Sequence, residues 1–285
     1  MNSSGDVVGS ALADDGTKHL TLWLAADAWQ NPVDLDAEIM ALPEAEPWEG
    51  LTIDYGMPSI NDQGQIAGTC TLPPVDGVTP RHAFFYDRYA EVPNEARFVV
   101  LPNAENLVWG YAYAISNSGL IAGRSVSYGN TQSVAALWDP QNGGTVKTLQ
   151  DPSDTVDLTS ASAVNDSGQV VCNGQLVTTG DTRAVIYIPG PPETYTVLEP
   201  LGTNSSTTHT SGYDTNTFGE VVGQTSTASG LRAFAYTTGM VSLGTLKGPS
   251  QAIAVNDAGQ VVGFYSDKFG GGFYAFLWTP SKGML

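Results

Sequence analysis

The sequence predicts an all-β protein, a six-bladed β-propeller of four-stranded antiparallel blades. Three observations predict it: a phrase that recurs six times, an aromatic column that recurs with it, and a composition rich in turn residues. The 285 residues include 32 glycines and 17 prolines, and only 14% of residues are charged. Such a composition is typical of short strands joined by tight turns. A closed all-β ring of this length can form one domain.

The recurring phrase begins with Asn or Ser and has Gly at its fourth position. Its copies are NSSGDVVG from Asn2, NDQGQIAG from Asn61, SNSGLIAG from Ser116, NDSGQVVC from Asn165, NTFGEVVG from Asn216 and NDAGQVVG from Asn256. The central glycines are 59, 55, 49, 51 and 40 residues apart. These spacings match or slightly exceed the roughly 40–50 residues of a propeller blade.

Each phrase predicts a tight β-hairpin, because Asn and Gly tolerate the positive φ that such turns require. A strand of small residues precedes it, as in AYAI (112–115), SASAV (160–164) and AIAV (252–255), and a β-branched strand follows it. A third strand ends in an aromatic residue in every repeat: Trp23, Tyr86, Trp138, Tyr187, Tyr236 and Trp278. A weaker fourth segment follows, as in TVKTL (145–149), TYTVL (194–198) and MVSL (240–243).

These four strands, here a to d, define one propeller domain over 1–285. Small residues on strand a suit the crowded position nearest the ring axis, and the strand c aromatics suit packing between blades. The expected blade units are approximately 1–50, 51–105, 106–156, 157–205, 206–248 and 249–285, with an acidic insertion at 25–50.

The repeated phrases resemble the extracellular HAF repeat family, over nearly the whole chain. RAFAYTTGMVSLGTLKG (232–248) and AVNDAGQVVGFYSD (254–267) match best, and the first repeat departs most. The strand order is also similar to that of kelch blades. The resemblance implies a propeller and an extracellular or secreted protein, although the N-terminus carries no signal-peptide pattern. It implies no catalytic residues.

Strand a of the first repeat is not supplied, and the chain ends where strand d of the last repeat begins. An open ring would leave sheet edges uncovered. The hypothesis from the sequence is that the chain is a fragment, or that ring closure uses an exchanged strand or a partner chain.

The net charge of −18 argues against a nucleic-acid partner, since an acidic field repels phosphate. No apolar run approaches the ~20 residues of a membrane span. Cys70 and Cys172 fall in strands of different repeats, so no mutual disulfide is expected. Three histidines are too few to favour zinc, so no metal site is assigned. Calcium held by carboxylates and carbonyls is compatible with the charge.

Residues that recur in every repeat are expected to maintain the scaffold. His19 and His82 share one column before strand c, and the Asn-Asp pairs of the hairpins lack calcium-loop spacing, so both are assigned structural roles. Function is expected on the b–c and d–a loops, opposite the hairpins. These loops are 71–81, 126–133, 173–182 and 266–273, and 40–50, 102–108, 150–157 and 199–207.

Eight unrepeated residues on this side are the candidate ligand-binding set, because aromatic faces beside carboxylates suit a sugar or a cation. They are Trp48, Asp54, Tyr55, Trp109, Tyr111, Asp157, His209 and Tyr213. The competing interpretation is that these residues only pack on one another. His209 suits either a general base or a hydrogen-bonded strand residue.

The insertion at 25–50 predicts a short helix or an acidic flap. Asn31 and Pro32 resemble a helix cap and first turn. Val33, Leu35, Ile39 and Leu42 form a loose apolar stripe. The alternative is a solvated edge loop.

The leading functional hypothesis is a non-catalytic binding or interaction module for a carbohydrate or a protein surface. No nucleophile, zinc-protease, phosphate or dinucleotide motif is present. The alternative is an enzyme with a site at the central funnel, either a glycan hydrolase or lyase or a small-molecule cyclase or isomerase. Asp54, Tyr111, His209 and Tyr213 would then be the groups to test. A purely structural surface repeat is the third hypothesis.

Overall fold

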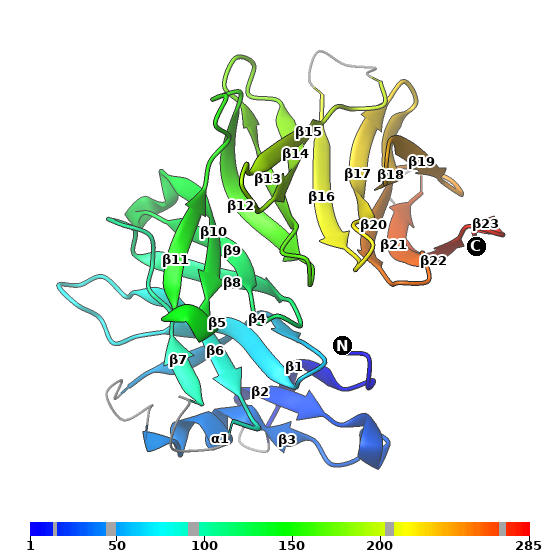
Figure 1. The fold of residues 1–285 in the computed structure, drawn as a ribbon. Coiled ribbons are helices and arrows are strands. Elements are labelled where there is room, and N and C mark those ends of the chain that lie inside the picture. Colours follow the sequence, from blue (N-terminus) through cyan, green and yellow to red (C-terminus); the bar gives the residue numbers. More distant parts are fainter. Residues whose placement is uncertain (14–15, 44–49, 91–96, 203–207, 268–271) are drawn as a thin grey trace. The chain divides into compact units, whose positions relative to one another are not determined.

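The computed structural model describes residues 1–285 except 14–15, 44–49, 91–96, 203–207 and 268–271. The described chain is almost entirely β-structure and divides into two compact units, unit 1 (Met1–Leu149) and unit 2 (Gln150–Leu285). The strands of both units are drawn in Figure 1. Every sequence repeat folds as an antiparallel meander, so the predicted all-β class is confirmed.

Unit 1 contains repeats 1 to 3. Repeat 1 is a three-stranded sheet that lacks strand a, as the sequence predicts, and repeats 2 and 3 are joined by one parallel contact between Arg81 and Trp109. The strands are β1 (Val7–Leu12), β2 (Lys18–Trp23) and β3 (Val33–Asp34); β4 (Thr52–Ile60), β5 (Gln65–Thr71), β6 (Arg81–Asp87) and β7 (Phe98–Val100); and β8 (Trp109–Ile115), β9 (Ile121–Val126), β10 (Ser133–Asp139) and β11 (Thr145–Leu149).

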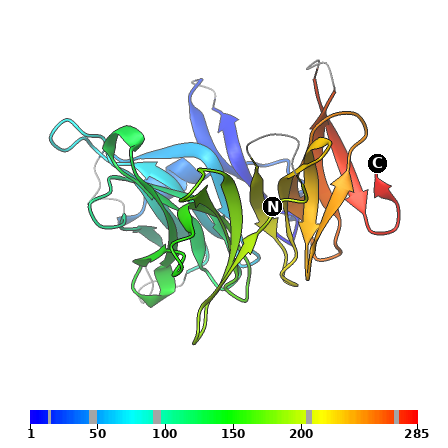
Figure 2. The same cartoon turned by 90° about the horizontal axis from the view of Figure 1, so that it is seen from above.

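Unit 2 contains repeats 4 to 6, each a separate four-stranded antiparallel sheet. The sheets of repeats 5 and 6 stand side by side, as Figures 1 and 2 show. The strands are β12 (Val156–Val164), β13 (Val170–Leu176), β14 (Thr182–Ile188) and β15 (Thr194–Leu198); β16 (Thr210–Thr215), β17 (Val221–Thr227), β18 (Gly230–Tyr236) and β19 (Met240–Gly244); and β20 (Ser250–Val255), β21 (Val261–Ser266), β22 (Phe273–Thr279) and β23 (Gly283–Met284).

The asparagine of the repeated phrase closes its own hairpin. In repeat 2, the Asn61 side-chain oxygen accepts the backbone N–H groups of Gln63 and Gln65, both at 3.0 Å. Gly64 adopts φ 76°, a conformation that a residue with a Cβ rarely takes. The central glycines of all six repeats have positive φ. The predicted hairpin chemistry is therefore confirmed.

The same asparagine also reaches the next repeat, and we call this contact the asparagine clasp. The Asn216 side-chain amide donates to the backbone carbonyl of Asn256 at 3.1 Å. Asn2, Asn61 and Asn165 make the equivalent bond to the first hairpin residue of repeats 2, 3 and 5, at 3.2, 2.9 and 3.0 Å. Three of the four donors are at most 5% exposed and Asn2 is 8% exposed, so each buried amide has an acceptor.

Apolar side chains fill the space between consecutive sheets of each unit. Val222, Ala233 and Ala235 of repeat 5 pack with Val261 and Phe276 of repeat 6. Tyr86 and Trp138 of strand c belong to these layers, with Tyr236 and Trp278 packed against them. Tyr86, Trp138 and Tyr187 are at most 1% exposed. Their burial agrees with the predicted scaffold role.

A β-bulge in strand a brings the backbone close to strand b in several repeats. The register shifts between Gly212 and Asp214 in β16 and between Ala252 and Ala254 in β20. A Cβ on Gly223, which pairs with Gly212, would lie 1.9 Å from the carbonyl oxygen of Ser211. Glycine closes the phrase in repeat 5 because no other residue fits beneath the bulge.

The insertion in repeat 1 forms a helix, but the predicted cap is wrong. The helix α1 spans Leu35–Met40, and the Asp34 side chain accepts the Ala37 N–H at 3.1 Å. Asn31 is not the cap, because Val33 and Asp34 first pair with β2 as strand d. The apolar stripe is confirmed: Leu35 and Ile39 are fully buried, with Val33 and Leu42 packed beside them. In the described part of the chain, no helix is both long and apolar enough to cross a membrane.

Cys70 and Cys172 are both free and buried, in β5 and β13. Burial raises the pKa of each thiol to about 12. Both thiols therefore remain protonated and unreactive at neutral pH.

A pair of matched variants measures the asparagine clasp. Asn216→Ala and Asn256→Ala both remove the bonds within one hairpin, whereas only Asn216 donates to a following repeat. We expect Asn216→Ala to cost about 0.5–1.5 kcal/mol more, because it also removes the hydrogen bond to the Asn256 carbonyl. Urea unfolding of both variants measures the difference, and equal losses would contradict the clasp.

Asp214 gives repeat 5 a pH-dependent contact with repeat 6. Its Oδ2 accepts the Val255 N–H at 2.9 Å, and burial raises its pKa to about 6 against the opposing bonds from Val255 and Thr215. A carboxyl whose pKa is raised by folding stabilises the fold below its unfolded value of 3.8, and this contribution is lost as the pH rises through about 6.

Asp214→Asn keeps an acceptor oxygen but no charge. We expect this variant to melt at a higher temperature than the parent at pH 7.5 and at nearly the same temperature at pH 4. Thermal unfolding followed by circular dichroism at both values measures this. A variant that is less stable at pH 7.5 would show that the carboxylate is favoured there.

Candidate functional site

The predicted site residues lie in both units, at the strand ends opposite the hairpins. In unit 1, Asp54 lies in β4, and Trp109 and Tyr111 lie at the start of β8. In unit 2, Asp157 lies in β12, Tyr213 lies in β16, and His209 directly precedes β16. Tyr55 lies in β4. Trp48 lies outside the described residues.

In unit 1, an arginine that the sequence analysis did not single out joins two of these residues. The Arg81 Nη1 donates to the Tyr111 hydroxyl at 3.2 Å and lies 3.7 Å from Asp54 Oδ2. The Arg81 guanidinium also lies 5.8 Å from the Tyr111 ring centroid. The side chains of Arg81 and Asp54 are 43% and 32% exposed, so both ends of the ion pair remain reachable from solvent.

A second arginine lies against the tyrosines. Arg124 in β9 pairs with Tyr111 across the sheet, and its guanidinium lies 5.1 Å from the Tyr111 ring centroid and 6.0 Å from that of Tyr113. Its Nε is buried without a hydrogen-bond partner among the described residues. Burial raises the pKa of Tyr113, which keeps this phenol neutral. The arginine is held by aromatic faces.

An aromatic pair, the half-buried Trp109 and the exposed Tyr128, lies beside Arg81, which pairs with Trp109 at the start of β8. The Trp109 ring lies 5.8 Å from the Tyr128 ring, and Trp109 Nε1 donates to the Thr79 carbonyl at 3.0 Å. Tyr128, in a 3₁₀ turn, is 64% exposed. We call the whole set the Arg81 cluster: Asp54, Arg81, Trp109, Tyr111, Tyr113, Arg124 and Tyr128.

In unit 2, His209 occupies the position that corresponds to Trp109. Thr182 and His209 form a parallel bridge, as Arg81 and Trp109 do. The His209 backbone N–H donates to Ser226 Oγ at 3.0 Å, and its ring Nε2 is buried without a hydrogen-bond partner in the described structure. Burial, and then the positive charge of Arg183, lower the pKa of this imidazole.

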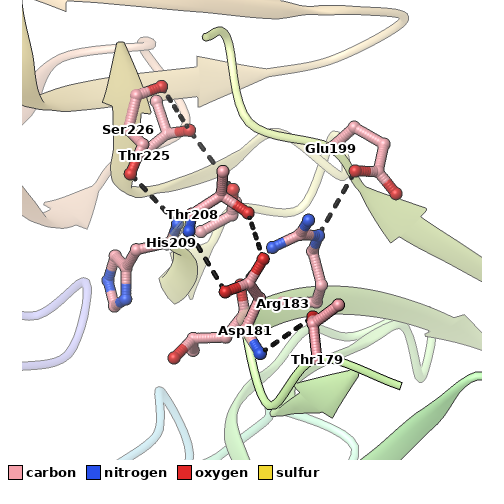
Figure 3. Close-up of polar contacts among 10 residues, drawn as sticks. Thr179, Asp181, Arg183, Glu199, Thr208, His209, Thr225 and Ser226 are labelled. Atoms are coloured by element: carbon pink, nitrogen blue, oxygen red, sulfur yellow. Dashed lines mark hydrogen bonds and ion pairs between the residues drawn. The ribbon is translucent and has the colours of Figure 1, made fainter. Parts of the chain in front are cut away.

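Hydrogen bonds beside His209 join residues at the ends of neighbouring strands, as Figure 3 shows. Asp181 accepts the backbone N–H and the hydroxyl of Thr208 at 3.2 and 2.8 Å. The buried Arg183 donates its Nε to Glu199 at 3.3 Å and its Nη1 to the Thr182 carbonyl at 2.9 Å. The His209 ring points away from Asp181 and Arg183 in this view. The backbone bond to Ser226 fits a strand residue, but the ring Nε2 has no partner among the described residues, so both interpretations of His209 stay predictions.

The remaining predicted residues do not gather around His209. Asp157 is exposed in β12. Tyr213 is the bulge residue of β16, and burial raises the pKa of its phenol. Among the residues that the structure describes, no hydrogen bond joins Asp157, His209 and Tyr213. In unit 2 the predicted set is therefore a series of separate residues.

The two histidines of the repeated column have partners that support their scaffold assignment. His19 Nδ1 lies 2.7 Å from Asp34 Oδ2, and His82 Nδ1 lies 2.8 Å from the Leu101 carbonyl oxygen. Within the described ranges, no three His, Cys, Asp or Glu side chains gather to hold a metal ion. The compatibility with calcium stays a prediction.

Comparison with known proteins supports the fold. No protein-family model and no curated protein matches the sequence. Among solved structures, *Porphyromonas gingivalis* dipeptidyl peptidase 4 is similar at 11% identity and a TM-score of 0.52, over 95% of this chain and 43% of that one. A puromycin hydrolase mutant complexed with PGG is similar at 10% identity and a TM-score of 0.57, over 99% of this chain and 52% of that one.

The matched regions of these structures are β-propeller domains, so the fold of this chain is of the β-propeller class. The chain spans about half the length of the solved chains it matches. The likeness is one of fold alone.

The environment of His209 predicts a pH-dependent stability. Folding lowers the pKa of this histidine, so the charged imidazole is disfavoured in the folded state. The fold therefore has its full stability above the unfolded pKa of about 6.5, and it loses stability as the pH falls from there through the folded pKa. His209→Gln has no such titration. We expect the parent to lose stability relative to this variant between pH 7.5 and pH 5, measured by urea unfolding at several pH values. A constant difference would show that His209 titrates normally.

Proposed function

We propose that this chain is a non-catalytic binding module, a propeller of six blades, and that it binds a carbohydrate at the Arg81 cluster. The observation that carries the proposal is the partly exposed Arg81, which contacts a carboxylate and a tyrosine hydroxyl beside the half-buried Trp109 and the exposed Tyr128. Convergent polar groups next to aromatic surface are typical of small-ligand sites.

Each part of the cluster suits one feature of a sugar. The faces of Trp109 and Tyr128 offer an apolar surface for the C–H side of a pyranose ring. Asp54 accepts hydroxyl hydrogen bonds, and Arg81 donates them or binds an acidic sugar's carboxylate. The separation of 3.7 Å between Arg81 and Asp54 leaves both groups with hydrogen-bonding capacity for a ligand.

The catalytic alternative has less support. It needs Asp54 and Tyr111 with free proton-transfer capacity, yet both contact Arg81. It also needs an accessible histidine, whereas His209 Nε2 is buried. A protein-surface ligand uses the same aromatic and charged groups and is an outcome of the test below. The resemblance to extracellular repeats supports placing the module outside the cell.

Substitution in the cluster tests the proposal. After a glycan array identifies a binder, Arg81→Ala should weaken its affinity by on the order of 10- to 100-fold, because a charged hydrogen bond contributes about 1.5–3 kcal/mol. Tyr111→Phe removes only a hydroxyl and should weaken it by about 2- to 10-fold. Isothermal titration calorimetry measures both.

Arg232→Ala is the matched control. Arg232 also lies at the start of a strand c and donates to the carbonyls of Leu231 and Ser229. We expect unchanged affinity in this variant. An array with no glycan binder, unaltered affinity in Arg81→Ala, or turnover of a bound glycan would each overturn the proposal.

A further inference from the structure

The Arg81 cluster has the opposite sign of charge to the whole chain. It contains two guanidiniums, those of Arg81 and Arg124, and one carboxylate, that of Asp54. It therefore carries one net positive charge, although the chain has a net charge of −18 and only 11 basic residues. The two guanidiniums lie 5.8 and 5.1 Å from the centroid of the same Tyr111 ring. All four residues belong to unit 1, so this geometry is set within that unit.

Arg81 has one edge of its guanidinium available for a ligand. Its Nη1 donates to the Tyr111 hydroxyl, and the same atom lies 3.7 Å from Asp54 Oδ2, which is too far for a hydrogen bond. Among the described residues, no acceptor takes a hydrogen bond from Arg81 Nε or Nη2. These two nitrogens form an edge that binds a carboxylate through two parallel hydrogen bonds. Because the side chain is 43% exposed, a ligand reaches this edge from solvent.

The groups around this edge suit the remainder of a sugar residue. Trp109 and Tyr128 provide aromatic surface for the C–H side of the ring. The Tyr111 hydroxyl accepts its bond from Arg81, so its own proton is a donor for a sugar oxygen. Asp54 accepts a sugar hydroxyl. The cluster therefore offers a cation, a donor, an acceptor and an apolar surface within one unit.

The charges also limit how many carboxylates a ligand carries. A single carboxylate on Arg81 lies close to two guanidiniums and one acid, so the local field favours it. A glycan with many carboxylates extends past the cluster, where a chain of charge −18 repels it over about 10 Å at 0.1 M salt. The balance of local attraction and general repulsion favours a ligand with one negative charge.

We propose that the Arg81 cluster selects a sugar residue with a single carboxylate, a terminal uronic acid, over the neutral sugar of the same configuration. This inference rests on the proposed function and names the ligand class of that site. The carboxylate binds Nε and Nη2 of Arg81, and the sugar hydroxyls bind Asp54 and Tyr111. Asp54 repels the carboxylate, so it lowers the preference that Arg81 creates.

Pairs of sugars that differ only in the carboxylate test this selection. One pair is methyl β-D-glucuronide and methyl β-D-glucoside, and the other is methyl α-D-galacturonide and methyl α-D-galactoside. In at least one pair, the acidic sugar should bind the intact chain about 10- to 100-fold more tightly, because it gains charged hydrogen bonds. Nuclear magnetic resonance titration at low ionic strength measures both affinities.

Two variants should change this preference in opposite directions. Arg81→Gln removes the cation and should reduce the preference to within about 2-fold. Asp54→Asn keeps an acceptor oxygen without the repelling charge and should raise the preference by about 2- to 5-fold. Arg232→Ala is the control and should leave it unchanged. Should Arg81→Gln lose the circular dichroism spectrum of the parent, Arg81→Lys replaces it. That variant keeps the charge without the paired donors and should lower the preference by about 3-fold or more.

The outcomes separate this inference from the proposed function. A neutral sugar that binds as tightly as its acidic counterpart would overturn the inference and leave carbohydrate binding intact. An unchanged preference in Arg81→Gln, or a reduced one in Asp54→Asn, would also overturn it. Trigalacturonate that binds more tightly than methyl α-D-galacturonide at low ionic strength would show that the site takes a polyanion, against the inference. A chain that binds no glycan of any kind would overturn both the inference and the proposed function.

Discussion

The asparagine amide that opens four of the hairpins is the interaction on which the architecture depends. Its oxygen closes the turn, and its nitrogen satisfies a carbonyl of the next sheet, so one buried side chain couples local and long-range structure. Because a buried amide without partners is costly, the hairpin and the spacing between sheets must form together. Small and apolar residues on the facing surfaces follow from that spacing. Gly223, which lies beneath the bulge in strand a of repeat 5, has no room for a Cβ atom.

The residues that maintain the scaffold and those of the candidate site lie at opposite ends of the strands. The hairpin end carries the clasp in four repeats, and the opposite strand ends are free to vary. In unit 1 these strand ends carry Arg81, Asp54, the half-buried Trp109 and the exposed Tyr128, which form the proposed ligand site. In unit 2 the corresponding position holds His209, whose neighbours fasten loops to strands. The same scaffold position therefore belongs to the proposed ligand site in one repeat and to a set of structural hydrogen bonds in another.

The sequence analysis found the periodic features and missed those that depend on pairing between strands. Hairpins, strand positions and the apolar stripe of α1 were predictable, since each follows from a local pattern. The cap was assigned to Asn31 because Asn before Pro is a good local signal. Asp34 caps the helix because pairing with β2 holds the preceding residues extended. Arg81 and Arg124 were not predicted, although both are unrepeated, because their contacts with Asp54 and the tyrosines depend on pairing between strands.

By itself, the sequence determined the repeat, its β-meander and the chemistry of its turns, because backbone preferences and alternating hydrophobicity act over a few residues. Only the tertiary structure decided which unrepeated residues meet. It joined Asp54 and Tyr111 through Arg81, and among the described residues it joined Asp157, His209 and Tyr213 by no hydrogen bond. The physical reason is that register between strands and packing between sheets set distances across dozens of residues, which no local pattern encodes.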